Sequence, residues 1–136
     1  MSDMSIKITL GHLMLAVQSQ ATARVAEMTP PGAYKFRVAK LLEAVDKEAA
    51  DFRKQNNALI QKHGITDDQG NPTMVGAPTM QVLAFNDAMQ NLTEVEVVIP
   101  YEPIFWNKLG PDAQAKLTIG DVRNLGPLLV EDEALA

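Results

Sequence analysis

The sequence contains no cysteine. Disulfide bonds, thiolate nucleophiles and thiolate metal ligands are therefore excluded, and a reducing compartment is compatible with the chain. Histidine is nearly as scarce, because His12 and His63 are the only two, and neither has a spacing typical of a metal site. We expect neither a metal nor another cofactor.

Long hydrophobic runs are also missing. No apolar run reaches the roughly 18–20 residues that cross a bilayer, and residues 1–6 lack the basic-then-apolar pattern of a secretion signal. We therefore expect no association with a membrane. The chain has 136 residues, of which 46% are hydrophobic and 21% charged, and this composition predicts one folded domain over residues 1–136.

Basic residues are few in the second half of the chain. Residues 65–136 hold three Lys or Arg against eleven Asp or Glu, whereas residues 1–64 hold nine against six. A nucleic-acid binder concentrates basic residues on one face, and here only Lys35, Arg37 and Lys40 form such a group. Their spacing fits the solvated face of a helix, so the sequence argues against nucleic acid as a partner.

The apolar residues predict helices over much of the chain. Residues 6–10 alternate like a short strand, and residues 10–28 then show helical spacing as far as the Thr-Pro-Pro-Gly stretch at 29–32. The strongest signal covers residues 33–63, which contain neither proline nor glycine and carry a heptad-like apolar stripe. Its members are Val38, Leu42, Val45, Ala49, Phe52 and Leu59.

We expect this long helix to belong to a helical hairpin. Gly64 ends it, residues 64–77 form a turn-rich loop, and a second helix begins near Pro78. The second helix repeats the heptad-like spacing, so the two helices should pack together. We expect Phe52 and Leu59 on the first helix to be buried against Phe85 and Met89 on the second.

The remaining residues predict short elements. Residues 95–99 alternate and are rich in β-branched side chains, so they predict a strand that Pro100 ends. Residues 121–130 predict a last helical stretch that Gly126 and Pro127 interrupt, and residues 131–136 form an acidic tail.

Two nearly identical motifs stand near the two ends, Lys-Ile-Thr-Leu-Gly at 7–11 and Lys-Leu-Thr-Ile-Gly at 116–120. A phosphate loop needs several glycines, and each motif has one. We interpret both as strand-to-helix turns with Thr9 and Thr118 as helix N-caps, the second with Asp121 in a capping box. The terminal strands should then join residues 95–99 in one small sheet, which gives a mostly helical α+β fold.

The stretch Ile-Pro-Tyr-Glu-Pro-Ile-Phe-Trp at 99–106 carries the clearest functional signal. Its two prolines stiffen it, and it concentrates residue types that dominate protein interfaces. Tyr101, Glu102, Phe105 and Trp106 are therefore candidate contacts with a partner protein. The alternative is that these aromatics close one end of the hydrophobic core.

Two other functions stay open. Arg24, Lys35 and Arg37, near the Pro-Pro turn, could hold the anionic group of a small ligand such as a nucleotide. An enzyme would have to rely on carboxylates such as Glu94, Glu96 and Glu102, and no pattern identifies catalytic residues among them.

Most of the chain resembles a family of small proteins encoded by tailed bacteriophages and prophages. The resembling segments are KITLGHLM, AYKFRVAKLLEAVDKEAADFRKQNNALIQKHG, DDQGN, EVEVVIPYEPI and KLTIGDVRNLGPLL, although the long helix is less charged here. The resemblance implies a phage origin, a small helical fold with a minor sheet, and no catalytic residues.

Together these features predict a phage-encoded, non-enzymatic protein that acts by binding another protein. The partner would be a component of the virion or a host protein such as a defence complex, and a homo-oligomer stays open. The protein would then be found in the host cytoplasm or in the phage particle.

Overall fold

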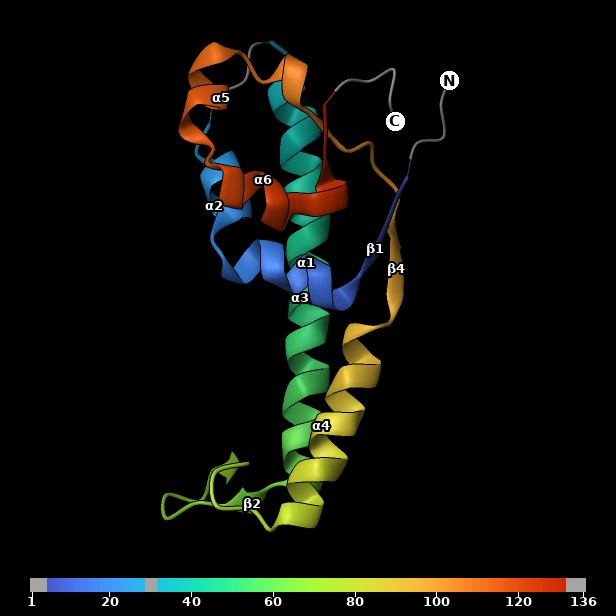
Figure 1. Ribbon diagram of the computed structural model, residues 1–136, viewed down its shortest axis with the longest axis vertical. Coiled ribbons are helices and arrows are strands. Elements are labelled where there is room, and N and C mark those ends of the chain that lie inside the picture. Colours follow the sequence, from blue (N-terminus) through green and yellow to red (C-terminus); the bar gives the residue numbers. More distant parts are fainter. Residues whose placement is uncertain (1–4, 29–31, 132–136) are drawn as a thin grey trace.

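One long helix, α3 (Tyr34–His63), runs through most of the length of the molecule (Figure 1). The computed structural model describes residues 5–28 and 32–131. The sequence predicted a helix over residues 33–63, and this prediction is confirmed to within one residue. The helix ends at Gly64, where the backbone becomes extended. Only glycine fits at this position, because a Cβ would lie 2.5 Å from the carbonyl oxygens of both Ile60 and Thr73.

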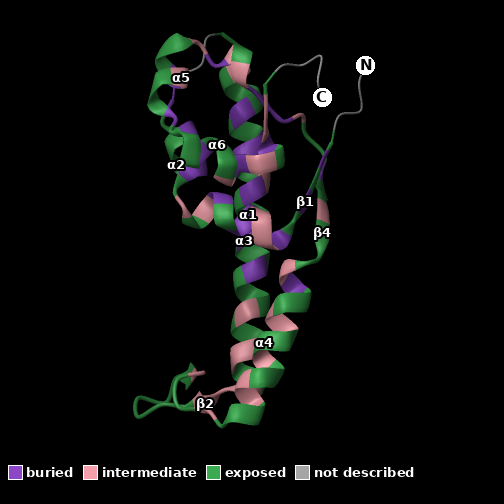
Figure 2. Cartoon of the chain, viewed as in Figure 1, coloured by how far each residue is buried: buried purple, intermediate pink, exposed green. Residues whose placement is uncertain are grey.

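The upper half of α3 belongs to a globular part, which we call the head. Around it lie β1 (Ile6–Thr9), α1 (Leu10–Gln18), α2 (Ala21–Ala26), β4 (Glu96–Ile99), β5 (Ile104–Phe105), η1 (Trp106–Lys108), α5 (Pro111–Lys116), α6 (Ile119–Leu125), η2 (Gly126–Leu128) and β6 (Leu129–Val130). The buried side chains gather here (Figure 2), and Leu13, Val45 and Leu125 are among those with no exposed surface.

The lower half of the molecule is a two-helix projection, which we call the arm. It consists of α3 beyond Phe52, the hairpin of β2 (Ile65–Thr66) and β3 (Pro72–Thr73), and α4 (Thr79–Thr93). α4 packs against α3, so the predicted helical hairpin is confirmed. Phe52 is buried, but Leu59, Phe85 and Met89 are only half-buried, because the arm has no third layer to cover them.

The predicted α+β class, mostly helical with minor strands, is confirmed, but the strands form three separate pairs. β1 pairs antiparallel with β4, as expected for the N-terminal strand. The C-terminal strand β6 instead pairs parallel with β5. Residues 117–119 are not a strand at all, because Leu117 and Thr118 are an extended link between α5 and α6 and Ile119 begins a helix.

The helix predicted over residues 10–28 is broken at Ser19 and Gln20. Gln20 has the left-handed backbone angle φ of 70°, which ends α1 and redirects the chain into α2. Helical apolar spacing continues across the break, so the sequence pattern gave no sign of it. The Arg24 guanidinium, on α2, donates a hydrogen bond to the Ser19 carbonyl and so stabilises this turn.

Both predicted threonine caps are confirmed. The Thr9 hydroxyl accepts from the His12 N–H at 3.2 Å, and the Thr118 hydroxyl accepts from the Asp121 N–H at 3.0 Å. Asp121 returns a bond by accepting from the Thr118 N–H, which completes the capping box. The similar sequences at the two ends therefore share one function, which is to begin a helix. Of the predicted acidic tail, residues 132–136 lie outside the described residues.

Candidate functional site

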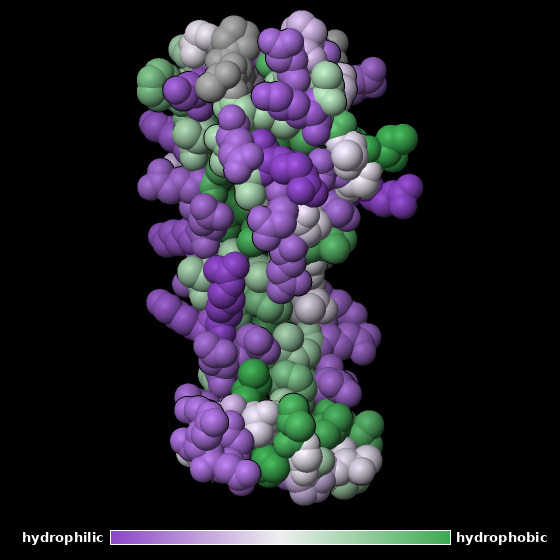
Figure 3. Space-filling view, turned by 90° about the vertical axis from the view of Figure 1, so that its left-hand side faces the viewer, coloured by the Kyte–Doolittle hydropathy of each residue, from purple (hydrophilic) through white to green (hydrophobic). Residues whose placement is uncertain are grey.

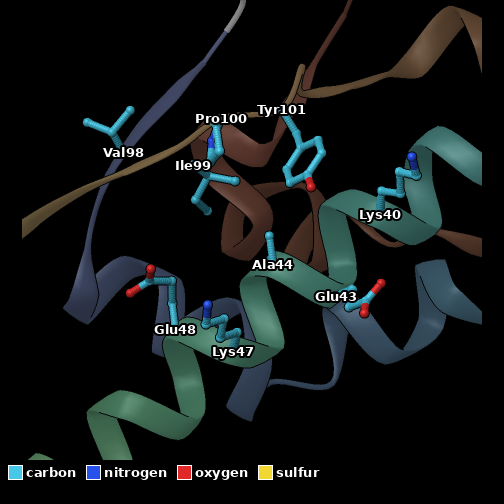
Figure 4. Close-up of a pocket in the computed structure, with 9 residues that line it drawn as sticks. All are labelled: Lys40, Glu43, Ala44, Lys47, Glu48, Val98, Ile99, Pro100 and Tyr101. Atoms are coloured by element: carbon cyan, nitrogen blue, oxygen red, sulfur yellow. The ribbon is translucent and has the colours of Figure 1, made fainter.

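A groove runs along the head between α3 and β4. Its volume is about 450 Å³, and Figure 4 shows the side chains around it. The α3 wall consists of Lys40, Glu43, Ala44, Lys47 and Glu48, and the strand side consists of Val98, Ile99, Pro100 and Tyr101. Two basic and two acidic side chains thus surround one small apolar residue, and the groove has no net charge.

The side chains of Tyr101 and Val98 point in different directions at this groove. The Tyr101 side chain points from the strand side toward α3 (Figure 4) and is 38% exposed. Val98 points away from α3 and is 54% exposed. Side chains alternate along a strand, and Ile99 is the residue of β4 that is buried in the core. Val98 is therefore an apolar side chain on the outer face of the sheet.

One backbone edge of β4 faces away from β1. Its register with β1 pairs Ile8 with Val97, and one step beyond the strand the Leu10 N–H donates to the Val95 carbonyl at 2.9 Å. Hydrogen-bonded and non-hydrogen-bonded pairs alternate in an antiparallel ladder, so Ile8 and Val97 are a bonded pair. The backbone N–H and C=O of Glu96 and Val98 consequently point away from β1.

Within the part of the chain that the structure describes, no strand pairs with β4 on that side. The β1 strand, by contrast, has η2 packed beside it. The free edge of β4 and the groove involve the same short strand, since Val98 and Ile99 line the groove. An unpaired edge of this kind can accept a further strand.

The four predicted partner contacts do not form one surface. Tyr101 lies at the groove, whereas the Glu102 carboxylate turns to Arg37 of α3, with 3.1 Å between the charged atoms. Trp106 is half-buried and packs against the core. Its carbonyl accepts a hydrogen bond from the Gln114 side-chain amide at 2.8 Å.

The prediction for Phe105 requires a correction, because its side chain has no exposed surface and cannot contact a partner on the folded protein. Phe105 is part of β5, which pairs with β6. Its backbone N–H donates to the Tyr34 hydroxyl at 2.6 Å, and the Lys108 ammonium lies 5.0 Å from the centre of its ring. The aromatic stretch therefore fastens the C-terminal part of the chain to α3.

Arg24, Lys35 and Arg37 do not converge on one anion site. Arg37 pairs with Glu102, and Arg24 pairs with Asp121 at 2.6 Å. Lys35 borders a separate hollow of about 280 Å³, which also has two carboxylates on its wall. Carboxylates thus accompany each of the three cations.

The pair between Arg24 and Asp121 is the most buried charge interaction described. The Asp121 side chain is 1% exposed and that of Arg24 45%, and the Arg24 Nε also donates to both carboxylate oxygens at 2.9 Å. The hydrogen bonds from Arg24 hold the pKa of Asp121 below its usual value, and the Thr118 N–H lowers that pKa further. The same contact raises the pKa of Arg24.

The sequence did not indicate this pair, because its members are 97 residues apart. The capping box at Thr118 could have drawn attention to Asp121, but a capping aspartate is ordinarily exposed. Its burial here follows from α6 packing against α1 and α2. The free edge of β4 was missed for a similar reason, since no residue pattern tells which side of a strand is paired.

The histidines and the remaining carboxylates are dispersed. Across residues 5–28 and 32–131, no three His, Asp or Glu side chains gather in a way that could hold a metal ion. His12 lies beside Gly126, and its Nε2 atom is buried without a hydrogen-bond partner in the described part of the chain. Glu96 is exposed on β4, and Glu94 lies at the end of α4.

Comparison with protein-family models, with curated proteins and with solved structures returned no match. In the described residues, no helix is long and apolar enough to span a lipid bilayer.

Proposed function

We propose that this chain is a phage-encoded, non-enzymatic protein that binds an extended segment of another protein along the free edge of β4. One observation carries the proposal: across the described residues, the edge of β4 that faces away from β1 has no partner strand, and β4 borders an open groove of about 450 Å³. The partner is a virion component or a host protein. The phage origin is part of the proposal and rests on the resemblance of the sequence segments given above to small phage proteins.

Backbone hydrogen bonds would supply the affinity in this mode of binding. The N–H and C=O groups of Glu96 and Val98 would pair with the incoming strand, as in other cases of strand addition. Side chains of an added strand alternate between two faces, so every second one would enter the groove. There it would meet Tyr101, which offers an aromatic surface and a hydroxyl group.

The charges of the groove bear on specificity. Lys40 and Lys47 would attract acidic side chains of the partner, and Glu43 and Glu48 would attract basic ones. A segment with charges of both signs therefore fits this wall better than a uniformly charged one. The groove does not favour a polyanion.

The test is a photoreactive amino acid at position 101 in full-length protein, made in cells that also produce the phage. We expect one defined protein to be crosslinked at this position, and mass spectrometry of the adduct identifies it. Its presence in purified particles would separate a virion partner from a host partner. A matched photoreactive residue at Ile119, which is 82% exposed elsewhere on the head, should not give this adduct.

Val98→Pro supplies the decisive control. Proline removes the N–H on the free edge but leaves the bonded pair of Ile8 and Val97 in place. The substitution should abolish the crosslink at position 101 while circular dichroism shows a folded protein. A crosslink that survives Val98→Pro at full yield would contradict strand addition.

A further inference from the structure

The far end of the arm exposes large apolar side chains. Between Phe52 and Leu92 no residue is buried. At the far end, Val75 is 82% exposed, Met80 77% and Leu83 56%. We call these three residues the tip surface, and Figure 3 shows hydrophobic side chains gathered at this end of the molecule.

α4 carries almost no charge. Asp87 is the only charged residue among its 15 residues, and the sequence has no Lys or Arg between Lys62 and Lys108. Exposed helices normally keep their outer face soluble with charged side chains. Protein interfaces instead have few charges at their centre and are enriched in methionine, and α4 exposes one charged residue, Asp87, and one methionine, Met80.

We propose that the tip surface and the outer face of α4 dock onto the same face of a second copy of this chain. In a two-fold symmetric contact each patch meets itself, so a charged patch meets its own charge. A nearly neutral face avoids this repulsion, and the apolar tip surface can pack against its own copy. Met80 and Leu83, one turn apart on α4, are the central contacts.

The chain exposes more surface than a compact monomer of its mass. The accessible surface is 8504 Å², whereas a compact monomer of 14.8 kDa is expected to expose roughly 7,000 Å². The difference of about 1,500 Å² belongs to the chain as a whole. A stable interface of ordinary size removes about 800 Å² from each partner, which is less than this difference.

The charges favour a second copy over an unrelated partner. An unrelated protein is typically guided and selected by opposite charges across the interface, and α4 offers one carboxylate for this purpose. Interfaces between identical chains are the more apolar class. Because the tip surface lies on the arm and the groove lies on the head, this inference stands independently of strand addition at β4.

The first experiment measures the mass of the full chain by sedimentation over a wide concentration range. We expect the wild-type protein to reach twice the monomer mass of 14.8 kDa. Leu83→Glu should raise the dissociation constant of the dimer by about 30-fold or more, the effect of losing a central contact. Ile119→Glu, which places the same charge at an exposed position of the head, should leave the dimer intact.

The second experiment locates the contact by disulfide crosslinking. The sequence has no cysteine, so an introduced cysteine is the only thiol in each chain. Single-cysteine variants Met80→Cys and Leu83→Cys should form a covalent dimer under mild oxidation, whereas Ile119→Cys should stay monomeric under denaturing electrophoresis. A wild-type protein that stays at 14.8 kDa at every concentration overturns the proposal. So does a dimer that Leu83→Glu leaves unchanged, or a contact of the tip surface with a different protein only.

Discussion

At the scale of single residues, the buried carboxylate of Asp121 links two distant parts of the chain. It accepts hydrogen bonds from Arg24 of α2 and from the N–H of Thr118. Both donors stabilise the charged form, and the hydrogen bonds from Arg24 are the main cause of the lowered pKa of Asp121. The charge of this one side chain therefore contributes to holding α6 against α2.

This arrangement predicts how stability depends on pH. The pKa of Asp121 is lower in the folded protein than in the unfolded chain, where an aspartate titrates near 3.9. The contribution of Asp121 to the free energy of unfolding is therefore complete above its pKa in the unfolded chain. It is lost as the pH falls through its pKa in the folded protein. We expect Asp121→Asn to lower the free energy of unfolding at pH 7, and the difference from wild type to shrink below about pH 4.

Urea titrations at pH 7 and at pH 2.5 measure this difference. Thr118→Ser, which keeps the cap and the carboxylate, should follow the wild-type curve. If the wild type and Asp121→Asn differ by the same free energy at both pH values, the ionised carboxylate does not make this contribution.

A second residue-scale prediction concerns Gly126 and His12. Gly126 has a positive φ of 52°, and a Cβ built on it would overlap the His12 imidazole ring. Both effects oppose any side chain: the backbone angle costs about 1–2 kcal/mol, and overpacking costs about 1–3 kcal/mol. Gly126→Ala should therefore reduce the free energy of unfolding by about 2 kcal/mol or more.

A double-mutant cycle separates the two causes. His12→Ala combined with Gly126→Ala should recover the steric part and leave the backbone part. If the two single substitutions simply add, the imidazole ring is not what excludes a side chain from position 126.

At the scale of elements, the sequence predicted what local rules determine. The length of α3 followed from an apolar stripe without proline or glycine, and the caps at Thr9 and Thr118 followed from the side chains that helix starts require. These features need only near neighbours along the chain.

The features that the sequence did not predict depend on distant contacts. Gln20 adopts a left-handed conformation where α1 gives way to α2, although glutamine has no local preference for it. The β6 strand forms because Leu129 lies beside Ile104, 25 positions earlier. Of the candidate site, Tyr101 was predicted, but the burial of Phe105 and the free edge of β4 depend on which elements pack together.

The boundary between head and arm on α3 gives an element-scale prediction. Phe52 is 7% exposed and is the last buried residue of α3, whereas Leu83 of α4 is 56% exposed. Phe52→Ala should cost about 3–5 kcal/mol, as truncations of core aromatics do. Leu83→Ala should change the free energy of unfolding of the monomer by about 0.5 kcal/mol or less.

Chemical denaturation at a low protein concentration, where chains are monomeric, gives both values. The two substitutions remove side chains from the same helical hairpin, so they are matched in location and differ in burial. Equal losses for the two variants would mean that the arm has a core of its own.

At the scale of the whole molecule, the two proposed binding surfaces lie on different parts. The groove and the free edge of β4 lie on the head, and the tip surface lies at the far end of α3 (Figure 1). A dimer joined through the arms leaves both heads accessible, so it presents two copies of the groove. Two linked sites bind a surface that carries many copies of the partner more tightly than one site does. The affinity rises by a factor of about 10²–10⁴ when both sites can bind at once.

The last prediction joins these two proposals. The unfolding midpoint of the wild-type protein should rise with protein concentration, because folding is coupled to dimer formation. Leu83→Glu should remove this dependence and should also lose the avid binding to a surface that carries many copies of the partner. Binding of one soluble partner segment to the head should be unchanged, since position 83 is remote from β4.

Val98→Pro should show the opposite pattern, with the concentration dependence kept and both kinds of binding lost. Calorimetry at several protein concentrations, together with binding to sparsely and densely coated surfaces, distinguishes the two variants. If Leu83→Glu weakens the binding of a single soluble segment as much as it weakens binding to the dense surface, the arm contacts the partner itself. The division of tasks between head and arm would then be wrong.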